Sequence, residues 1–537
     1  MLESSDTDMV DAVAEKLAPP EPIPQEQAKV RLFSVCDIGV VKIHIPAGPS
    51  NIDADTVHIE DVAEHNPLSR TSKKTNHDIE WPDEIHIDDP RNWPTWRKWM
   101  VTLIVSSISL CSTYTSSVYT TTYGQLIHEF HTSQEVVTLG LSLYVLGLGL
   151  GPMLLAPLSE FFGRRPIYLT SWAGFVIWLI PCAVAQNIQT MLVARFFNGM
   201  CGSGFMSVAG GTVGDLFNVH ELALPMMVYT ASPFLGPELG PIIGGFICQN
   251  ADWRWVFYVL IIWSTIAYLA VVFAVPETYG PILLKQRLAR ESQERGGEGI
   301  PAKSEKSILL TLAHSCLRPM QLLIFEPMCL ALCTFSAVIL GILYLFFEAF
   351  PLVFGGVYGF SLQQSGLTFI GLLIGMSIGL ATNPFWDRHY ESLFAKSLAH
   401  PPPPELRLPP AMAGSLLIPV GIFWFAWTAR SSIHWIVPII GTSVFGIGVL
   451  LTFSGIFTFL VDAYPQFAAS GLASNSFLRS CFAAGFPLFA VQMYHRLGNP
   501  WATSLLGFIA VACAPFPFLF FKYGATLRKR SRFARTA

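Results

Sequence analysis

Charged residues are scarce in this chain. Asp, Glu, Lys and Arg make up only 13% of its 537 residues, against roughly 25% in a soluble domain. Hydrophobic residues make up 52%, and the mean hydropathy is +0.47. This composition excludes a soluble enzyme of ordinary make-up and predicts a membrane protein.

A disulfide framework is also missing. Most of the ten cysteines lie inside apolar runs, where a thiol behaves as a small hydrophobe. Their placement implies no disulfide pairing. These cysteines are Cys111, Cys182, Cys201, Cys248, Cys329, Cys333, Cys481 and Cys513.

Motifs for ATP hydrolysis and for metal binding are absent from the sequence. No G-x-x-x-x-G-K-[ST] loop occurs, so transport driven directly by ATP within this chain is excluded. His434 and His495 are isolated, and His128 and His131 have no partners at metal-ligand spacing. We predict no enzyme activity, no metal, no cofactor and no nucleic-acid partner.

Long apolar runs dominate what is present. Runs of about 20 residues, enough for a helix to cross a ~30 Å hydrocarbon core, recur from Lys98 onward. A polar insert divides them into six and six, which predicts an all-α membrane protein with twelve transmembrane helices in two six-helix bundles. The predicted spans are 99–121, 134–155, 167–186, 189–210, 223–248, 254–275, 325–349, 362–383, 411–429, 433–459, 466–491 and 500–521.

The charge distribution completes the domain plan. Residues 1–90 hold 19 of the 37 acidic residues but only 7 of the 33 basic ones. Their Pro clusters and their lack of a sustained amphipathic period predict a mostly disordered segment. We predict five parts: an acidic cytoplasmic tail over 1–95, an N-terminal bundle over 96–275, a cytoplasmic loop over 276–320, a C-terminal bundle over 321–521 and a basic cytoplasmic tail over 522–537.

Lys and Arg cluster in alternate loops, which predicts the orientation. Flanking positive charge is retained in the cytoplasm, and loops such as 122–133 and 249–253 carry no Lys or Arg. Both termini are therefore predicted to be cytoplasmic. We expect a multi-pass monomer in the bilayer of the plasma membrane, with the vacuolar membrane as the alternative.

The loops after spans two and eight match each other. Each places a proline three residues before a carboxylate, Pro157 before Glu160 and Pro384 before Asp387. Matching loops in two halves are typical of secondary transporters built from an internal repeat.

Three motifs resemble those of the major facilitator superfamily. Residues 151–165 resemble its motif between spans two and three, and Arg195, Asn198 and Gly199 resemble its R-x-x-Q-G motif, with Asn198 in place of Gln. Over 91–521 the chain is similar to fungal twelve-span drug:proton antiporters of the cycloheximide-resistance and polyamine-exporter type. The antiporter motif G-x-x-x-G-P-x-x-G-G, typical of exporters, is matched by Gly236, Gly240, Pro241, Gly244 and Gly245.

The resemblance implies gating residues at the cytoplasmic edge. A carboxylate there can pair with guanidinium groups or cap the positive end of the next helix, and so latch the two halves in one state. The alternative is that Arg164 and Arg165 only fix the topology. The gating candidates are Glu160, Gly163, Arg164 and Arg165 in the first half and Asp387 and Arg388 in the second.

Arg195, Glu238 and Arg479 lie well inside predicted spans. Arg195 and Arg479 are expected to have acidic or carbonyl partners, because an unpaired charge there costs at least ~2.5 kcal/mol. We hypothesise that Glu238 pairs with Arg195 or titrates during proton exchange. Purely structural ion pairs are the competing interpretation.

The glycines of span five are spaced for close helix packing. Gly236, Gly240 and Gly244 align on one helix face, and Pro241 weakens the backbone hydrogen bonding there. Generic tight packing alone would explain the glycines. Pro241 and the paired Gly244-Gly245 favour the antiporter interpretation.

The resemblance also places the substrate near the midplane between the halves. Aromatic faces accept flat hydrophobic molecules and cations, and Glu348 would favour a cationic group. The alternative is that these rings serve only packing or an interfacial belt and that Glu348 lies at the outer boundary. The candidate cavity residues are Tyr114, Ser117, Tyr119, Asn198, Tyr344, Phe347, Glu348, Phe453 and Phe457.

We therefore predict a proton-coupled antiporter that exports a small organic compound by alternating access, with the proton gradient as its energy source. The candidate cargoes are a drug, a fungal secondary metabolite or toxin, and a polyamine, in that order. A proton-coupled importer on the same fold is the nearest alternative. A non-transporting receptor or scaffold that binds partners through its acidic tail belongs to a different class.

Overall fold

The structure, a computed structural model, describes residues 89–218, 221–294, 316–396, 403–529, 531 and 533. Every regular element within these residues is a helix, which confirms the all-α prediction. Most of the predicted acidic tail, about half of the predicted central loop and part of the predicted basic tail lie outside the described residues.

The helices follow one another with short connections. The first group comprises η3 (Pro90–Asn92), α2 (Thr95–Val118), η4 (Tyr119–Thr122), α3 (Tyr123–Phe130), α4 (Gln134–Phe162), α5 (Arg164–Ala183), α6 (Ile188–Leu216), α7 (Ala223–Asn250), α8 (Arg254–Ala274) and α9 (Gly280–Glu294). The second comprises a short helix at Cys316–Phe325, α11 (Pro327–Tyr358), α12 (Leu362–Leu367), α13 (Ile370–Ala381), α14 (Asn383–Lys396), η5 (Pro404–Arg407), α15 (Pro409–Thr428), α16 (Ile436–Ala463), η6 (Pro465–Phe467), α17 (Ala468–Leu497), α18 (Asn499–Cys513) and α19 (Pro515–Arg528).

The predicted membrane spans correspond to these helices. Among the described residues, nine helical segments are long and apolar enough to cross a membrane, and three of these combine consecutive helices, as Thr95–Phe130 combines α2, η4 and α3. The remaining three predicted spans are α6, α7 and α17, which have 29, 28 and 30 residues. These three are less apolar because they contain the glycines, polar residues and buried charges of the motifs.

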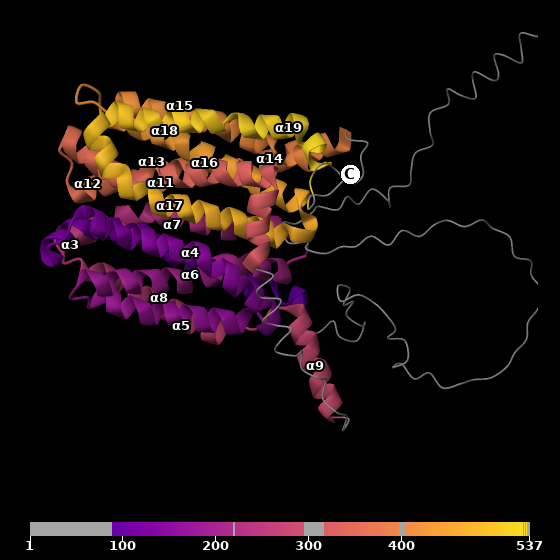
Figure 1. Cartoon of the computed structure of the whole chain (residues 1–537). Helices are drawn as coiled ribbons and strands as arrows, with labels where there is room; N and C mark the ends of the chain where they lie inside the picture. The colour runs from indigo at the N-terminus through magenta and orange to yellow at the C-terminus, as the bar shows by residue number, and fades with distance from the viewer. Residues whose placement is uncertain are drawn as a thin grey trace, which may run out of the picture.

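The long helices lie roughly side by side in two halves (Figure 1). In the first half α2 packs on α7, and α6 packs on both α4 and α5; in the second α11 packs on α17, and α16 packs on α13 and α15. The halves meet along two seams, α4 against α17 and α7 against α12 and α13. We call the end of the bundle with α9 and α14 the α9 end, and the end with α3 and α12 the α3 end (Figure 1).

Local sequence determines where several of these helices begin and end. The side chain of Asn187 accepts a hydrogen bond from the Thr190 backbone N–H at 2.8 Å and so caps the start of α6. The helix α11 stops at Gly359, whose φ of 68° lies in the left-handed region. Ser361 then starts α12 in a capping box with Gln364. These caps place the α3 end of α11 and α12 beside α7.

The glycine motif of α7 brings its backbone against two other helices. A Cβ added to Gly236 would lie 2.7 Å from the carbonyl oxygen of Leu110, and one added to Gly240 would lie 2.6 Å from the Val118 nitrogen. Both neighbours belong to α2, and Gly244 meets the side chains of Val118 in α2 and Thr121 in η4. The predicted single face for these three glycines is therefore present in the structure. Gly245 points elsewhere, toward the backbone of α12 in the other half.

We expect Gly240→Ala to destabilise the protein, because the added Cβ meets backbone atoms of α2 that cannot rotate away. A melting curve of the detergent-purified protein should show a clearly lower midpoint. Gly485→Ala in α17 is the matched control, since nothing lies within 4 Å of its added Cβ and Ala is the better helix former by up to about 1 kcal/mol. Equal melting of both variants would contradict the close-packing role.

Candidate functional site

Arg195 lies at the centre of the first half and is fully buried. Its guanidinium stacks between the rings of Tyr119 and Tyr144, 4.4 and 4.3 Å from their centroids. It donates hydrogen bonds to three backbone carbonyl oxygens, those of Thr115 at 2.9 Å, Ser116 at 3.3 Å and Gly140 at 3.4 Å. The predicted carbonyl partners are therefore present, and they hold α2, α4 and α6 together.

Glu238 of α7 is also fully buried, and neither carboxyl oxygen has a hydrogen-bond partner among the described residues. Glu238 and Arg195 form no ion pair in the structure, so the predicted pairing of these two residues is not supported. Titration during proton exchange stays a prediction. Burying an ionised carboxylate without a partner is costly, whereas the protonated form avoids that cost.

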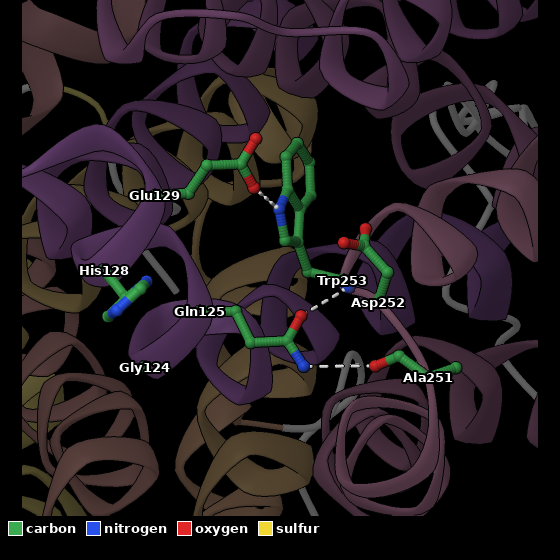
Figure 2. A pocket seen from close by; sticks show the side chains of 7 residues that line it. All are labelled: Gly124, Gln125, His128, Glu129, Ala251, Asp252 and Trp253. Atoms are coloured by element: carbon green, nitrogen blue, oxygen red, sulfur yellow. Dashed lines mark hydrogen bonds between the residues drawn. The ribbon is translucent and has the colours of Figure 1, made fainter.

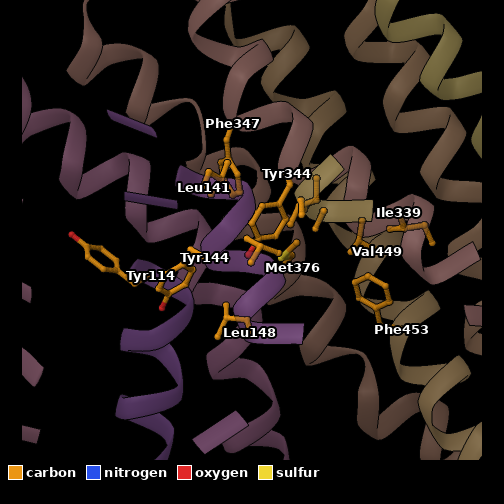
Figure 3. Packing of buried hydrophobic residues seen from close by; sticks show 14 of the residues in the cluster. Tyr114, Leu141, Tyr144, Leu148, Ile339, Tyr344, Phe347, Met376, Val449 and Phe453 are labelled. Atoms are coloured by element: carbon orange, nitrogen blue, oxygen red, sulfur yellow. The ribbon is translucent and has the colours of Figure 1, made fainter. Parts of the chain in front are cut away.

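Tyr344 of α11 lies near the buried charged residues of both halves. Its hydroxyl is 3.0 Å from the Ser116 hydroxyl of α2, so this hydrogen bond joins the two halves. Glu238, Arg195 and Arg479 all lie close enough to act on the Tyr344 hydroxyl electrostatically. Figure 3 shows Tyr344 beside Tyr144 of α4, at the seam between the halves.

An aromatic stack extends this centre toward the α7 seam. The rings of Phe453 and Phe457 in α16 are nearly parallel, 5.8 Å apart, and Phe234 of α7 stacks on Phe453 at 5.4 Å. The Arg479 guanidinium of α17 lies 5.2 and 5.0 Å from the centroids of the Phe453 and Phe457 rings. The stack therefore includes side chains from both halves.

Some predicted cavity residues lie inside the first half instead. Asn198 donates to the Phe175 carbonyl oxygen of α5 at 2.8 Å and is fully buried. Tyr114 packs edge-on against Trp263 of α8, and Figure 3 shows it pointing away from Tyr344. The placement of Asn198 and Tyr114 in a cavity between the halves is therefore wrong for this structure, because packing turns these side chains toward α5 and α8.

Three further predicted cavity residues have other roles in this structure. Ser117 faces Gly240 of α7, and Tyr119 packs on Arg195 within the first half. Phe347 stacks on Phe369 between α11 and α13. Tyr344, Phe453 and Phe457 are therefore the predicted aromatic residues that the structure brings to the centre described above.

Two hydrogen bonds, which we call the α3-end latch, join the halves on the side of Tyr344 that faces the α3 end. Gln134 donates to Glu348 of α11 at 3.3 Å. The next residue, Glu135, accepts a hydrogen bond from Gln492 of α17 at 2.7 Å. Each carboxylate thus meets a neutral amide from the other half. Glu348 belongs to this latch rather than to the midplane where it was predicted.

A separate pocket at the α3 end is lined by α3 and by the connection between α7 and α8 (Figure 2). Gln125 donates to the Ala251 carbonyl oxygen at 3.0 Å and accepts from the Trp253 backbone at 2.6 Å. Glu129 accepts from the Trp253 indole at 2.6 Å and pairs with Arg254, also at 2.6 Å. These contacts fix α3 to the first half.

At the α9 end, Glu277 caps the start of α5. Its carboxylate accepts hydrogen bonds from the backbone N–H groups of Arg164 at 2.9 Å and Arg165 at 3.1 Å, which the helix itself leaves unpaired. It also accepts from the N–H groups of Thr278 and Tyr279. A carboxylate is favoured there by the positive end of the helix.

The side chain of Arg164 links three helices at the same end. It pairs with Asp215 of α6 at 3.4 Å, donates to the Ser159 hydroxyl of α4 at 2.8 Å and lies over the Tyr279 ring. Gly163, with φ of 100°, makes the turn from α4 to α5. Glu160 is exposed at this end. The predicted gating residues Gly163, Arg164 and Arg165 thus gather around Glu277 and Asp215.

The second half has a corresponding arrangement. Arg407, just before α15, pairs with Asp462 of α16 at 2.9 Å and lies over Tyr390. Asp387 is close enough to Arg407 for electrostatic attraction, whereas Arg388 is exposed. Each half therefore has an Arg–Asp ion pair at the α9 end, Arg164 with Asp215 in the first half and Arg407 with Asp462 in the second. In the second half the paired arginine is Arg407 and not the predicted Arg388.

Sequence reasoning did not identify six charged residues of these clusters, namely Asp215, Glu277, Glu405, Arg407, Asp462 and Arg528. The carboxylate of Glu405 binds Arg528 at the end of α19 through two hydrogen bonds of 2.9 Å, and both residues are buried. Asp215 has no neighbouring Arg in the sequence, and Glu277 has no charged residue close to it in the sequence. Their partners lie about 50 to 120 residues away, so no local spacing reveals them.

We expect Glu277→Ala to lower the free energy of unfolding by about 1–2 kcal/mol, because four backbone N–H groups lose their acceptor. The free energy of unfolding is measured by titrating the purified protein with SDS. Glu277→Gln should retain part of the stability through its amide oxygen. The control is Glu221→Gln, an exposed acid with one long ion pair to Lys98; an equal loss in this control would refute the capping role.

The α3-end latch should hold the halves closed. In the double variant Gln134→Ala, Gln492→Ala, each lost hydrogen bond to a carboxylate is worth roughly 1.5 kcal/mol or more, so the open population should rise about tenfold or more. A cysteine placed at Ser142, buried on the α4–α17 seam, should then react faster with an impermeant maleimide. The exposed Gln189→Ala is the control. An unchanged rate in the double variant argues against a latch.

Comparison with known proteins relates this geometry to a family. The sequence profile of the Major Facilitator Superfamily matches residues 105–487. Efflux pump atB of Aspergillus terreus is 55% identical over 395 residues, 72% of this chain and 83% of that protein. "Probable drug/proton antiporter YHK8" of Saccharomyces cerevisiae is 39% identical, over 86% of this chain and 89% of that one.

A solved structure shares the fold. The xylose transporter XylE from E. coli matches 79% of this chain and 99% of its own length, with a TM-score of 0.56 at 15% sequence identity. The predicted fold, with its helices in two bundles, is confirmed by this likeness.

Proposed function

The chain belongs to the Major Facilitator Superfamily, and from this premise we propose that it exports a small organic compound in exchange for protons by alternating access. The observation that carries the proposal is Glu238, a fully buried carboxyl without a hydrogen-bond partner among the described residues, on the helix that contacts both halves. Relatives named as an efflux pump and as a drug/proton antiporter support the same direction of transport. As a member of this family of transporters, the chain is not an enzyme.

The conformational cycle follows from the two seams. In this structure the halves are joined toward the α3 end by the latch and by the Tyr344–Ser116 hydrogen bond. Cargo enters when the α9 end opens while these α3-end contacts hold. When the halves rock, the latch opens, and the clusters around Arg164 and Arg407 move with their own halves as rigid units. The bundles 96–275 and 321–521 are the moving parts in this proposal.

The proton carrier in this proposal is Glu238. When the α3 end opens, water reaches the carboxyl and it takes up a proton from outside. Closure then buries the neutral form, which costs far less than burying the ion. Opening at the α9 end releases the proton to the cytoplasm. Arg195, held by carbonyl oxygens and rings, stays fixed within the first half throughout the cycle.

The orientation and location also belong to the proposal. The excess of Lys and Arg in the loops and tail at the α9 end supports a cytoplasmic α9 end with both termini inside. We place the protein in the plasma membrane, with the vacuolar membrane as the alternative, and as a monomer. Its energy source is the proton gradient. The cargo is a drug, toxin or secondary metabolite, and a polyamine is the alternative.

A proton-driven uptake assay tests this function. In proteoliposomes with an acidic lumen, cargo from a panel of hydrophobic toxins and spermidine should accumulate, and a protonophore should abolish the accumulation. Accumulation that requires an acidic exterior instead would identify an importer.

Glu238→Gln should lose gradient-driven accumulation by at least about tenfold while retaining exchange of labelled for unlabelled cargo, because exchange needs no proton transfer. The exposed Glu391→Gln in α14 serves as the control and should behave as the wild type. A Glu238→Gln protein that still exchanges protons for cargo at the native rate would remove this residue from the mechanism.

A further inference from the structure

Arg479 occupies an unusual position in the centre of the molecule. It lies in the membrane-spanning helix α17, yet among the described residues its contacts are two phenyl rings and no carboxylate. Its Nε has no hydrogen-bond partner in the described part of the chain. Cation–π contacts alone leave the five N–H donors of the guanidinium poorly satisfied. Among the described residues, the guanidinium therefore has hydrogen-bond donors without acceptors inside a membrane span.

The other charged groups near the centre are shielded. Arg195 and Glu238 are fully buried, and Glu348 is 4% exposed and accepts a hydrogen bond from Gln134. Arg479 alone among these four is partly exposed. A molecule that enters between the halves thus meets a positive charge, while the negative groups are covered.

The rings beneath Arg479 form a flat platform. Phe453 and Phe457 are inclined by only 7°, and Phe234 from the other half continues the stack at 25°. Phe453 lies inside the stack at 1% exposed, whereas Phe457 is partly exposed and offers a surface on which a further aromatic ring can pack. The guanidinium beside them presents its donors in a planar fork that matches two oxygens of a carboxylate or sulfonate.

We propose that Arg479, Phe453 and Phe457 form the cargo-binding site, and that it selects aromatic compounds that carry an acidic group. The acid pairs with the guanidinium, and the ring packs on the platform. This inference deepens the proposed export function and rests on it for the direction of movement, but the binding step does not depend on proton coupling. It disfavours a polyamine cargo, since a polycation would face the one exposed charge of like sign.

Ligand binding to the detergent-purified full chain tests the site with three two-ring probes of matched size. Naphthalene-2-sulfonate is permanently anionic, naphthalene-2-sulfonamide is neutral and N-methylquinolinium is permanently cationic. Equilibrium dialysis should show the anion bound about tenfold to a hundredfold more tightly than the neutral probe. Arg479→Gln should remove this preference and leave the neutral probe unaffected. Arg479→Lys should keep part of it, because the charge remains while the fork is lost.

Further variants separate the site from general effects on folding. Phe457→Leu should weaken all three probes that stack, while keeping the preference for the anion. Arg496→Gln, an exposed arginine near the end of the same helix, should bind as the wild type. Tighter binding of the cationic probe, or an anion preference that survives in a folded Arg479→Gln protein, overturns the proposal.

Transport distinguishes this inference from the proposed function. If the anion binds through Arg479 but is not moved by a proton gradient, the binding site stands and the export function fails. If neutral compounds are exported and no anion preference is found, the export function stands and the selectivity for acids is refuted.

Discussion

The close approach of α7 to two other backbones is the constraint on which the rest of the structure depends. Its Gly240 face lies against α2, and its Gly245 face meets α12 of the other half. In lipid, helices associate through close packing rather than through the hydrophobic effect, so such small residues decide which helices touch. Because one helix makes both contacts, α7 and its Glu238 lie where the two halves meet.

Buried charge is handled in two different ways in this molecule. Arg195 is satisfied by backbone carbonyl oxygens and aromatic faces, which keep its environment constant. Among the described residues, Glu238 has no hydrogen-bond partner, and Arg479 has two phenyl rings but no acceptor for its Nε. A satisfied charge stabilises one arrangement of helices, whereas an unsatisfied one gains by binding something else. Arg195 is therefore a structural residue of the first half, whereas Glu238 and Arg479 are the residues to which we assign proton exchange and cargo binding.

Much of the fold was predictable from sequence, because apolar length and glycine spacing are local properties. The approximate positions of the spans, the single face of Gly236, Gly240 and Gly244, and the matching of the two halves all follow from short stretches of chain. The exact helix ends do not, since α11 runs to Tyr358, beyond the predicted end at 349. The rotation of each helix about its axis does not, since neighbouring helices set it. Asn198 therefore faces α5 rather than the centre. The partners of Arg164 are distant in sequence for the same reason.

The segment that ends each half contacts the beginning of the third membrane span of the same half. Glu277 follows α8 and holds the beginning of α5, and Arg528 ends α19 and holds Glu405, just before α15. Each half is thus a closed unit whose final contact is supplied by its last-made segment. During synthesis the first half becomes complete before any residue of α11 has emerged, so the chain assembles as two successive units that need each other only for the seams.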